Sequence, residues 1–254
     1  MKFGIIAGNT IKEMVHEKLF VAALVVAVGI LGLSLLLGSL SFAEQNKILA
    51  DIGFVAVQIS GLLLAIFGGA YLLPREIEKQ TCLLMLARPV SRAEFVLGKV
   101  FGLAGFAILV MVSLSLLLGL LLSYSSLQEW VRHLLIVSSL VAETCLLLGL
   151  VVLTSLLVRP SIALMVGWVL FLWGHWLPDL QHFAAKSENI ILPLVAQVSP
   201  WLVPHFSRMN WKTYRVIEIG VEPGEIVWFV THSLGWALML SILIVVVFRR
   251  KDLV

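Results

Sequence analysis

The most regular feature of the sequence is a series of long apolar segments separated by short polar ones. Six of them approach or exceed the roughly 20 residues that an α-helix needs to cross the hydrocarbon core of a bilayer, and they carry very few charged side chains. These segments are 19–40, 52–73, 95–123, 131–158, 161–177 and 226–248. The pattern predicts an all-α integral membrane protein with six transmembrane helices.

The stretch before the first span, 1–18, has a different pattern, in which apolar residues recur every three or four positions. The apolar positions are Phe3, Ile6, Ala7, Ile11, Met14 and Val15. Charged and polar residues fall largely between them, which is typical of an amphipathic helix. We expect this interfacial helix to lie on the membrane surface.

Residues that cap helices mark three expected helix starts. Thr10 with Glu13 and Ser91 with Glu94 have the spacing of a capping box, in which a hydroxyl and a carboxylate satisfy the first free backbone N–H groups. Asp51 stands directly before the second span, where its carboxylate is suited to capping. We therefore expect helices to begin after Asp51 and Ser91, and a helix to start or restart at Thr10.

A long region, 178–225, separates the fifth and sixth spans. Its apolar stretch 190–203 contains Pro193 and Pro200 and is followed by Pro204, so it is too short and too interrupted to cross a bilayer. It predicts an external region with short re-entrant or interfacial helices, with Trp201 and Trp211 at the level of the lipid headgroups.

Composition supports a membrane protein. Hydrophobic residues make up 60% of the chain and charged residues 13%, whereas about a quarter of a soluble domain is charged. The net charge of +3 does not indicate nucleic-acid binding, because the basic residues cluster beside apolar segments and form no basic face with interleaved aromatic residues. The lipid bilayer is the expected surrounding, and nucleic acid is not an expected partner.

The distribution of Lys and Arg predicts the orientation. With the N-terminus inside, twelve basic residues fall on the cytoplasmic side and six on the outer side, as the positive-inside rule requires. Both termini, including the tail 249–254, are therefore expected in the cytoplasm of a multi-pass protein of the bacterial inner or plasma membrane. Lys99 lies near the start of the third span, and we expect its ammonium group to snorkel to the interface.

The segment 74–94, between the second and third spans, is the most informative part of the chain. It combines a charged run at its start, an apolar stretch over 81–87, and a break at Arg88-Pro89. Physically this is a cytoplasmic loop that holds one short amphipathic helix and is anchored in the membrane at both ends. Such a helix can move as a rigid unit with the second and third spans.

This segment resembles the loop between the second and third spans of ABC-2-type transporter permeases. The residues that carry the resemblance are Glu76, Glu78, Thr81, Leu83, Leu84, Pro89, Ser91, Arg92, Gly98 and Lys99. Gln80 departs from the family pattern, which usually has a small residue before the threonine. The layout of a surface helix, six spans, a broken apolar stretch and a basic tail is similar as well, and resembles the permeases of copper-enzyme maturation and multidrug export systems.

The resemblance implies one ABC-2-type transmembrane domain over 1–254. The chain would be the permease subunit that exports a substrate across the inner membrane while a separate ATPase hydrolyses ATP. The implied ATPase contacts are Arg75, Glu76, Glu78, Lys79, Thr81, Leu83 and Leu84. Two ATPase copies and a second permease copy, in a homodimer or a homologous heterodimer, are the implied partners; ATP and Mg would be bound by the ATPase, with no cofactor in this chain.

The residues themselves give few signs of catalysis. The Gly98-Lys99 pair is followed by Val100 and lacks the glycine that a phosphate-binding loop places five residues earlier, so we expect the chain not to be an enzyme. Glu143 is the one carboxylate deep in a predicted span, and its cost in a membrane makes it a functional candidate. It is suited either to cargo binding, proton relay or pairing across a dimer, or to a hydrogen bond at a helix interface.

Histidines on or near the predicted outer side are weak candidates for metal binding. His175, His182 and His205 have side chains that suit copper, but their spacing is not that of a metal site, and we expect none. Two further functions stay open: a membrane scaffold or signalling subunit that transports nothing, and a permease that serves the maturation of a periplasmic copper enzyme. An ion-coupled transporter working alone would show internal repeats, which the sequence does not clearly contain.

Overall fold

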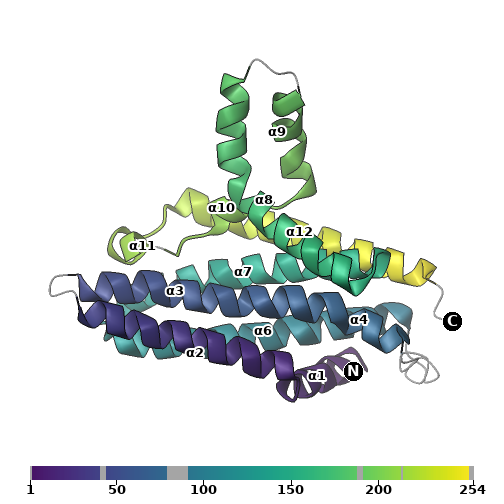
Figure 1. The fold of residues 1–254 in the computed structure, drawn as a ribbon, viewed down its shortest axis with the longest axis horizontal. Coiled ribbons are helices and arrows are strands. Elements are labelled where there is room, and N and C mark those ends of the chain that lie inside the picture. Colours follow the sequence, from purple (N-terminus) through teal and green to yellow (C-terminus); the bar gives the residue numbers. More distant parts are fainter. Residues whose placement is uncertain (1, 41–43, 79–90, 188–190, 213, 252–254) are drawn as a thin grey trace.

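The computed structural model describes residues 2–40, 44–78, 91–187, 191–212 and 214–251, and in these ranges the regular elements are all helices (Figure 1). Six of the described helical segments are long and apolar enough to cross a membrane. Each of them overlaps one of the six apolar segments expected from the sequence. The predicted all-α fold with six spans is therefore confirmed. The protein is therefore a multi-pass membrane protein.

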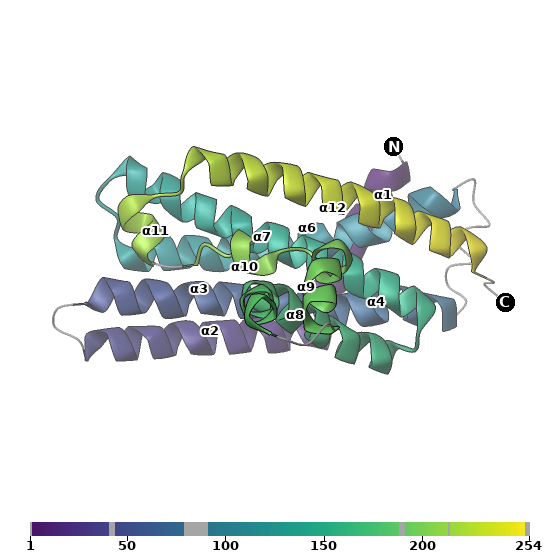
Figure 2. The same cartoon turned by 90° about the horizontal axis from the view of Figure 1, so that it is seen from above.

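The spans form an elongated bundle. They comprise α2 (Lys18–Ser39), α3 (Gln45–Leu63) continued by η1 (Leu64–Gly68) and α4 (Gly69–Glu78), α6 (Arg92–Leu122), α7 (Leu127–Leu157), α8 (Pro160–Lys186) and α12 (Pro223–Arg250). Apart from the second half of α8, they run roughly side by side along the long axis (Figure 2). The core lies between α3, α6 and α7, where large side chains such as Phe54, Phe106 and Ile136 are fully buried.

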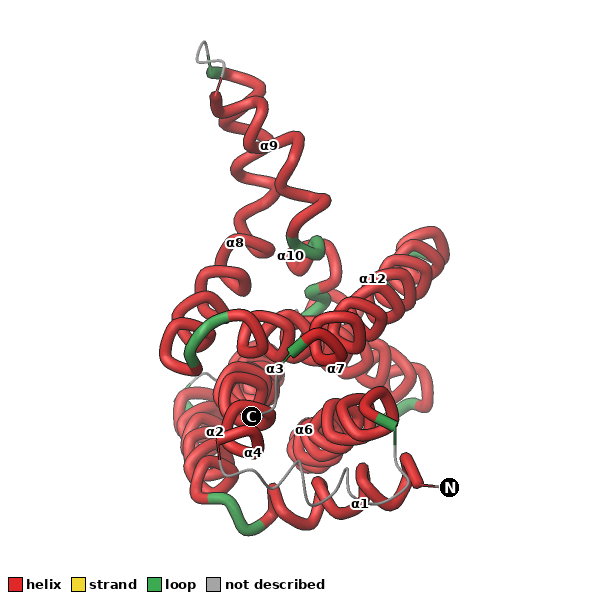
Figure 3. Tube along the Cα trace, turned by 90° about the vertical axis from the view of Figure 1, so that its right-hand side faces the viewer, coloured by secondary structure: helices red, strands yellow, loops and turns green. Residues whose placement is uncertain are grey.

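Both chain ends lie at the same end of this bundle, which we call the terminal end (Figures 1 and 2). There α1 (Lys2–Val15) packs against α6 and lies crosswise to the bundle axis, as the end-on view shows (Figure 3). Its Ile6 and Thr10 are buried, and Ile5 is exposed. One face of α1 is therefore turned to the bundle and the other away from it.

Two of the three expected helix starts are wrong, and one is confirmed. Thr10 lies inside α1, where its hydroxyl donates to the carbonyl of Ile6 at 3.0 Å. Asp51 lies inside α3, which begins at Gln45, because the residues before Asp51 continue the helical path. At α6 the capping box is complete: the Ser91 hydroxyl accepts from the Glu94 N–H, and the Glu94 carboxylate accepts from the Ser91 N–H.

The second span contains a π-helical turn. Over Leu64–Gly68 the backbone hydrogen bonds widen to the π-helical pattern before the α-helix resumes at Gly69. Such turns insert one extra residue into a helix and occur frequently at functional sites. Gly68 lets this turn approach α6 closely, since a Cβ there would lie 3.0 Å from Leu103 Cδ1.

An arm projects sideways from the bundle between the fifth and sixth spans. The second half of α8 and the antiparallel α9 (Ile191–Leu202) form this hairpin, which stands away from the other helices (Figures 1 and 3). Pro178 lies within α8, so the helix continues beyond the expected limit of 177. The chain returns through α10 (Phe206–Met209) and α11 (Tyr214–Ile219) to α12.

Candidate functional site

The terminal end of the bundle holds a buried cation that joins three helices. Lys99 on α6 is only 3% exposed, and its Nζ lies 3.0 Å from Glu13 Oε2 on α1. It also forms an ion pair with Glu76 on α4. The expected snorkelling is therefore wrong, because two carboxylates from neighbouring helices neutralise the ammonium group inside the protein.

Small side chains allow α1 to come this close to α6. A Cβ at Gly102, one turn after Lys99, would lie 2.7 Å from Thr10 Cβ and 2.8 Å from the carbonyl oxygen of Ala7. Only glycine leaves room for that approach, which brings Glu13 within reach of Lys99. Close packing of two backbones through glycine is common between membrane helices.

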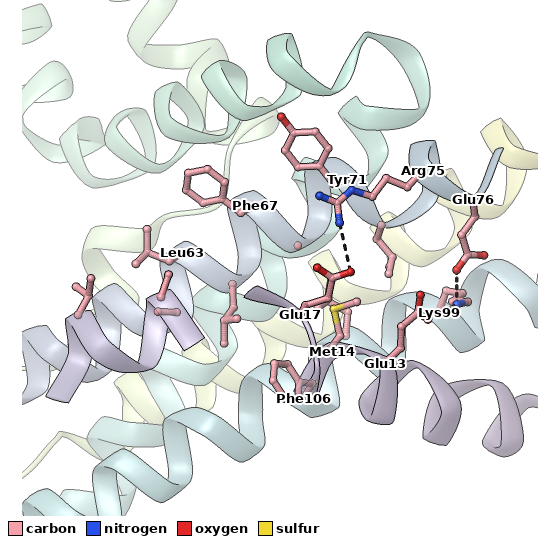
Figure 4. Close-up of a pocket in the computed structure, with 17 residues that line it drawn as sticks. Glu13, Met14, Glu17, Leu63, Phe67, Tyr71, Arg75, Glu76, Lys99 and Phe106 are labelled. Atoms are coloured by element: carbon pink, nitrogen blue, oxygen red, sulfur yellow. Dashed lines mark hydrogen bonds and ion pairs between the residues drawn. The ribbon is translucent and has the colours of Figure 1, made fainter. Parts of the chain in front are cut away.

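A second ion pair lies beside the first. Arg75 Nη1 on α4 is 3.4 Å from Glu17 Oε1 in the link between α1 and α2, and the guanidinium group lies over the Tyr71 ring at 5.0 Å from its centroid. Figure 4 shows these two pairs side by side. Arg75 and Glu17 are both partly exposed, so this pair closes the outer edge of the cluster.

The two ion pairs border a cavity of about 540 Å³ between α1, α2, the second span and α6. The lining residues from α1 and its link to α2 are Glu13, Met14 and Glu17. From the other helices the lining residues are Ala22, Ala23, Val26, Leu63, Leu64, Phe67, Gly68, Tyr71, Leu72, Arg75, Glu76, Lys99, Leu103 and Phe106. The charged residues therefore gather at one end of the cavity, and the remaining wall is mainly apolar.

Three of the predicted ATPase contacts lie in the described part of the chain. Arg75, Glu76 and Glu78 are in the last turns of α4, where Glu78 is exposed and Glu76 points inward to Lys99. The other four, Lys79, Thr81, Leu83 and Leu84, lie outside the described residues, as does Pro89. The helices that flank this segment, α4 and α6, are both anchored in the bundle at the terminal end.

The C-terminal tail is fastened to the same end. Arg92 Nη1, at the start of α6, donates to the carbonyl oxygens of Arg249 at 3.1 Å and Lys251 at 3.3 Å. Lys251 Nζ in turn donates to the carbonyl of Leu156 at 2.6 Å. The last turn of α12 is thereby joined to the helix that follows the segment 74–94.

Glu143 lies in a second buried polar cluster, near the middle of α7, and is 2% exposed. Its Oε1 accepts a hydrogen bond from Gln58 Nε2 on α3 at 2.8 Å and lies 3.6 Å from His175 Nε2 on α8. Its Oε2 is buried and has no hydrogen-bond partner among the described residues. The carboxylate thus lies where three helices of one chain meet.

The segment after α10 reaches into this cluster. Lys212 Nζ donates to Gln58 Oε1, and Asn210 Nδ2 lies 3.1 Å from His175 Nε2. Burial lowers the pKa of the Lys212 ammonium group below its ordinary value, although the Glu143 carboxylate raises it in part. Sequence reasoning missed Gln58 and Lys212, yet Gln58 is the one amide within an otherwise apolar span, which is a detectable signal.

The three histidines considered for metal binding are not brought together. Among the described residues, no group of three or more His, Cys, Asp or Glu side chains is placed to hold a metal ion. His175 belongs to the Glu143 cluster, while His205 lies beside His232 of α12, with 6.1 Å between ring centroids. Burial, together with the nearby Arg208 cation, lowers the pKa of His205.

Comparison with known protein families gave a match. A search of curated proteins found none. A family model described as "ABC-2 family transporter protein" matches residues 13–178, a region that runs from the end of α1 through Glu143 to Pro178 in α8. Because the match covers well over half of the sequence, the chain belongs to the ABC-2 family of transporter membrane proteins.

Proposed function

We propose that the chain is the permease subunit of an ABC transporter and that a separate ATPase supplies the energy. The observation that carries this proposal is that α4 and α6, the helices on either side of the segment 79–90 in the sequence, are joined by the buried Lys99–Glu76 pair. A force that an ATPase applied to the segment between them would reach the second and third spans together. ATP and Mg²⁺ would be held by the ATPase, and this chain would not hydrolyse ATP.

The proposal places the terminal end of the bundle in the cytoplasm. The excess of Lys and Arg on that side supports this orientation, and it puts Glu78 at the surface that faces a soluble ATPase. Export is the direction we propose, because it is the usual direction in the family that the sequence resembles. Of the contacts that the resemblance implies, the ATPase would meet Arg75, Glu78, Lys79, Thr81, Leu83 and Leu84, whereas Glu76 is paired with Lys99 inside the bundle and would act only through that pair.

A second permease copy is part of the proposal, with one ATPase for each copy. The arm supports it, since this hairpin leaves large apolar side chains exposed: Trp176, Phe183, Ile191, Leu194, Val198, Trp201 and Leu202 are each at least 44% exposed. In a membrane such a surface is covered by lipid, as on α2, or by another chain, and we propose the second permease copy as its cover. A homodimer and a heterodimer with a homologous chain are both consistent with this surface.

Co-purification with the ATPase tests the proposal. A candidate soluble ABC ATPase would be expressed with tagged wild type, with Glu78→Lys, and with Glu44→Lys as the matched control. Both glutamates are exposed, but Glu44 precedes α3 at the opposite end of the bundle. We expect the ATPase to be retained by wild type and Glu44→Lys and lost from Glu78→Lys.

A replacement of 81–87 by polar residues should abolish retention in the same way. Size-exclusion profiles would show whether each variant is folded. Retention that is equal for the Glu78→Lys and Glu44→Lys variants, or absent from wild type, would remove the basis for an ATPase-docking segment. Stimulation of the retained ATPase by candidate substrates would then separate a transporter from a scaffold that carries nothing.

A further inference from the structure

The cavity at the terminal end has the size and shape of a site for a small ligand. Its volume of about 540 Å³ falls within the roughly 300–1,000 Å³ that is usual for pockets that bind drug-sized molecules. It lies within a single chain, between α1, α2, the second span and α6. A second copy of the protein is therefore not needed to complete it.

The wall of the cavity divides into two chemical regions. The apolar region is formed by side chains of α2, η1 and α6, including Val26, Phe67 and Phe106. The polar region holds three carboxylates, Glu13, Glu17 and Glu76, and two cations, Arg75 and Lys99. The carboxylates outnumber the cations by one, so the polar region has an excess negative charge.

The two cations of the polar region are already engaged. Lys99 is held between Glu13 and Glu76, and Arg75 is held by Glu17 and the Tyr71 ring. An incoming anion would have to displace these carboxylates, whereas an incoming cation adds positive charge to a cluster in which three carboxylates share two cations. Phe67 and Tyr71 add aromatic rings, which attract cations through their π faces.

The cavity can be reached from the side of the molecule. Val26 lines the cavity and is 43% exposed, and Ala22 also lines it and is exposed. Both belong to α2, whose outer surface is apolar over most of its length, as a surface in contact with lipid would be. Glu17 and Arg75 are partly exposed at the other side of the cavity, where the bundle ends.

The π-helical turn shapes the wall at this point. Leu64, Phe67 and Gly68 all belong to η1 and line the cavity. The extra residue of a π-helical turn changes the angular register of the helix that follows, and so contributes to placing Tyr71, Arg75 and Glu76 toward the same cavity. The departure from regular α-helix therefore coincides with the junction of the apolar and polar regions.

We propose that this cavity binds a cationic amphiphile of drug size, with its apolar body against α2, η1 and α6 and its positive charge beside Glu13, Glu17 and Glu76. The ligand enters from the lipid leaflet at the terminal end. This inference deepens the proposed function by naming a substrate class, and the transport of the ligand rests on that function. Binding itself depends only on this chain.

Equilibrium binding to the purified chain in detergent, with no ATPase present, tests the inference. The probe is tetraphenylphosphonium, and tetraphenylborate, an ion of nearly the same shape and opposite charge, is titrated in a separate experiment because the two ions precipitate together. We expect saturable binding of one tetraphenylphosphonium per chain and much weaker binding of tetraphenylborate. Equal affinity for the anion, or no saturable binding of the cation, would overturn the inference.

One pair of variants locates the site. Ala22→Phe fills the cavity, while Val25→Phe adds the same ring to a 64% exposed position of α2 that does not line the cavity. We expect Ala22→Phe to weaken binding by at least about tenfold, equivalent to about 1.4 kcal/mol, and Val25→Phe to leave it unchanged. Equal affinities for these two variants would place the bound cation elsewhere.

The charge is tested by Glu17→Gln, with Glu44→Gln as its control at the opposite end. A unit charge at about 4 Å contributes roughly 1 kcal/mol in water and more near protein, so Glu17→Gln should weaken cation binding by about fivefold or more. Unchanged affinity in Glu17→Gln contradicts the charge argument. If wild type binds tetraphenylphosphonium as expected but no ATPase co-purifies, the proposed function fails and this inference stands. If the ATPase co-purifies but wild type does not bind tetraphenylphosphonium, this inference alone is overturned.

Discussion

Two groups of charged side chains lie inside the helical bundle, and their buried charges are satisfied in different ways. At the terminal end, the Lys99 ammonium group faces two carboxylates, so a direct ion pair joins α6 to α4 and another joins it to α1. Near the middle of α7, the Glu143 carboxylate and the Lys212 ammonium group are bridged by the amide of Gln58.

The difference shows what each cluster holds in place. The Lys99 cluster joins spans that flank the segment 74–94, and its charges compensate one another directly. The Glu143 cluster instead fastens the segment after α10 to the bundle, and it leaves one carboxylate oxygen without a partner among the described residues. Direct pairing suits the force transmission that we propose for this junction, whereas the amide bridge leaves one buried polar atom unsatisfied in the described part of the chain, which is costly.

The largest expected effect comes from removing the cation of the first cluster. Lys99→Met leaves the largely buried Glu76 carboxylate beside the half-exposed Glu13 without a counter-charge, and breaking a buried pair costs about 3–5 kcal/mol. We expect the lowest thermal unfolding midpoint of all the variants considered, measured on detergent-purified protein. Lys99→Met combined with Glu76→Gln should recover much of the loss, because the buried negative charge is then removed as well.

The control for this variant is Lys47→Met. Lys47 and Glu44 also form an ion pair, at 3.5 Å, but both side chains are more than half exposed, and exposed pairs contribute about 0–1 kcal/mol. A Lys99→Met midpoint that equals that of Lys47→Met would show that the three-helix junction does not depend on the ion pairs.

The spans and one helix start could be predicted from the sequence, whereas the partners of the buried charges could not. The six spans were predicted because the length of apolar residues that crosses a bilayer is a one-dimensional property of the chain. The capping box of Ser91 and Glu94 was predicted because both residues lie within one helical turn. Thr10 has the same local pattern as Ser91, yet it lies inside α1, which begins at Lys2. There Thr10 packs against Gly102 of α6, a contact that the local capping pattern does not reveal.

The partners of the buried charges were beyond such reasoning. Lys99 and Glu13 are 86 residues apart in the sequence, and Lys212 and Gln58 are 154 apart. Only the packing of α1 on α6, and the return of the chain from the arm, bring these residues together. The cavity beside Lys99 depends on long-range ion pairs of this kind and on a π-helical turn, none of which leaves a periodic pattern in the sequence.

The second effect is smaller and concerns the amide bridge. Gln58→Leu removes the donor to Glu143 and the acceptor of Lys212 together, and leaving buried polar groups unsatisfied costs about 1–3 kcal/mol. We expect a lower unfolding midpoint and faster proteolysis of the segment after α10. Glu143→Gln in the same background should recover part of the stability, because a neutral amide is less costly to bury than an unpaired carboxylate.

The matched control is Gln181→Leu, which changes the same residue type within the arm. Proteolysis that rises equally in both variants would mean that the Glu143 cluster does not fasten the segment. A double variant that is no more stable than Gln58→Leu alone would show that the unpartnered oxygen of Glu143 carries no cost.

The smallest effect is a pH dependence at the base of the arm, outside both clusters. His205 is part-buried: its backbone N–H donates to His232 Nε2 at 3.3 Å, its ring lies near Trp228, and the Arg208 cation is close by. Burial and Arg208 lower the pKa of His205 in the folded protein, so the unfolded chain binds more protons between that lowered pKa and the ordinary value near 6.5. Stability therefore rises with pH across this window and falls on acidification.

We expect the unfolding midpoint of wild type to fall by about 2 °C or less between pH 7 and pH 5 through this residue, a small shift because His205 remains partly exposed. The unfolding midpoint of the His205→Gln variant should fall by less than that of wild type. The midpoint of the His16→Gln variant, which alters an exposed histidine at the terminal end, should fall as much as that of wild type. If His205→Gln and His16→Gln respond equally to acid, the arm is not fastened through a neutral His205. The acid sensitivity that remains would then come from other titratable groups, among them His232, which lies beside His205, and the carboxylates of the two clusters.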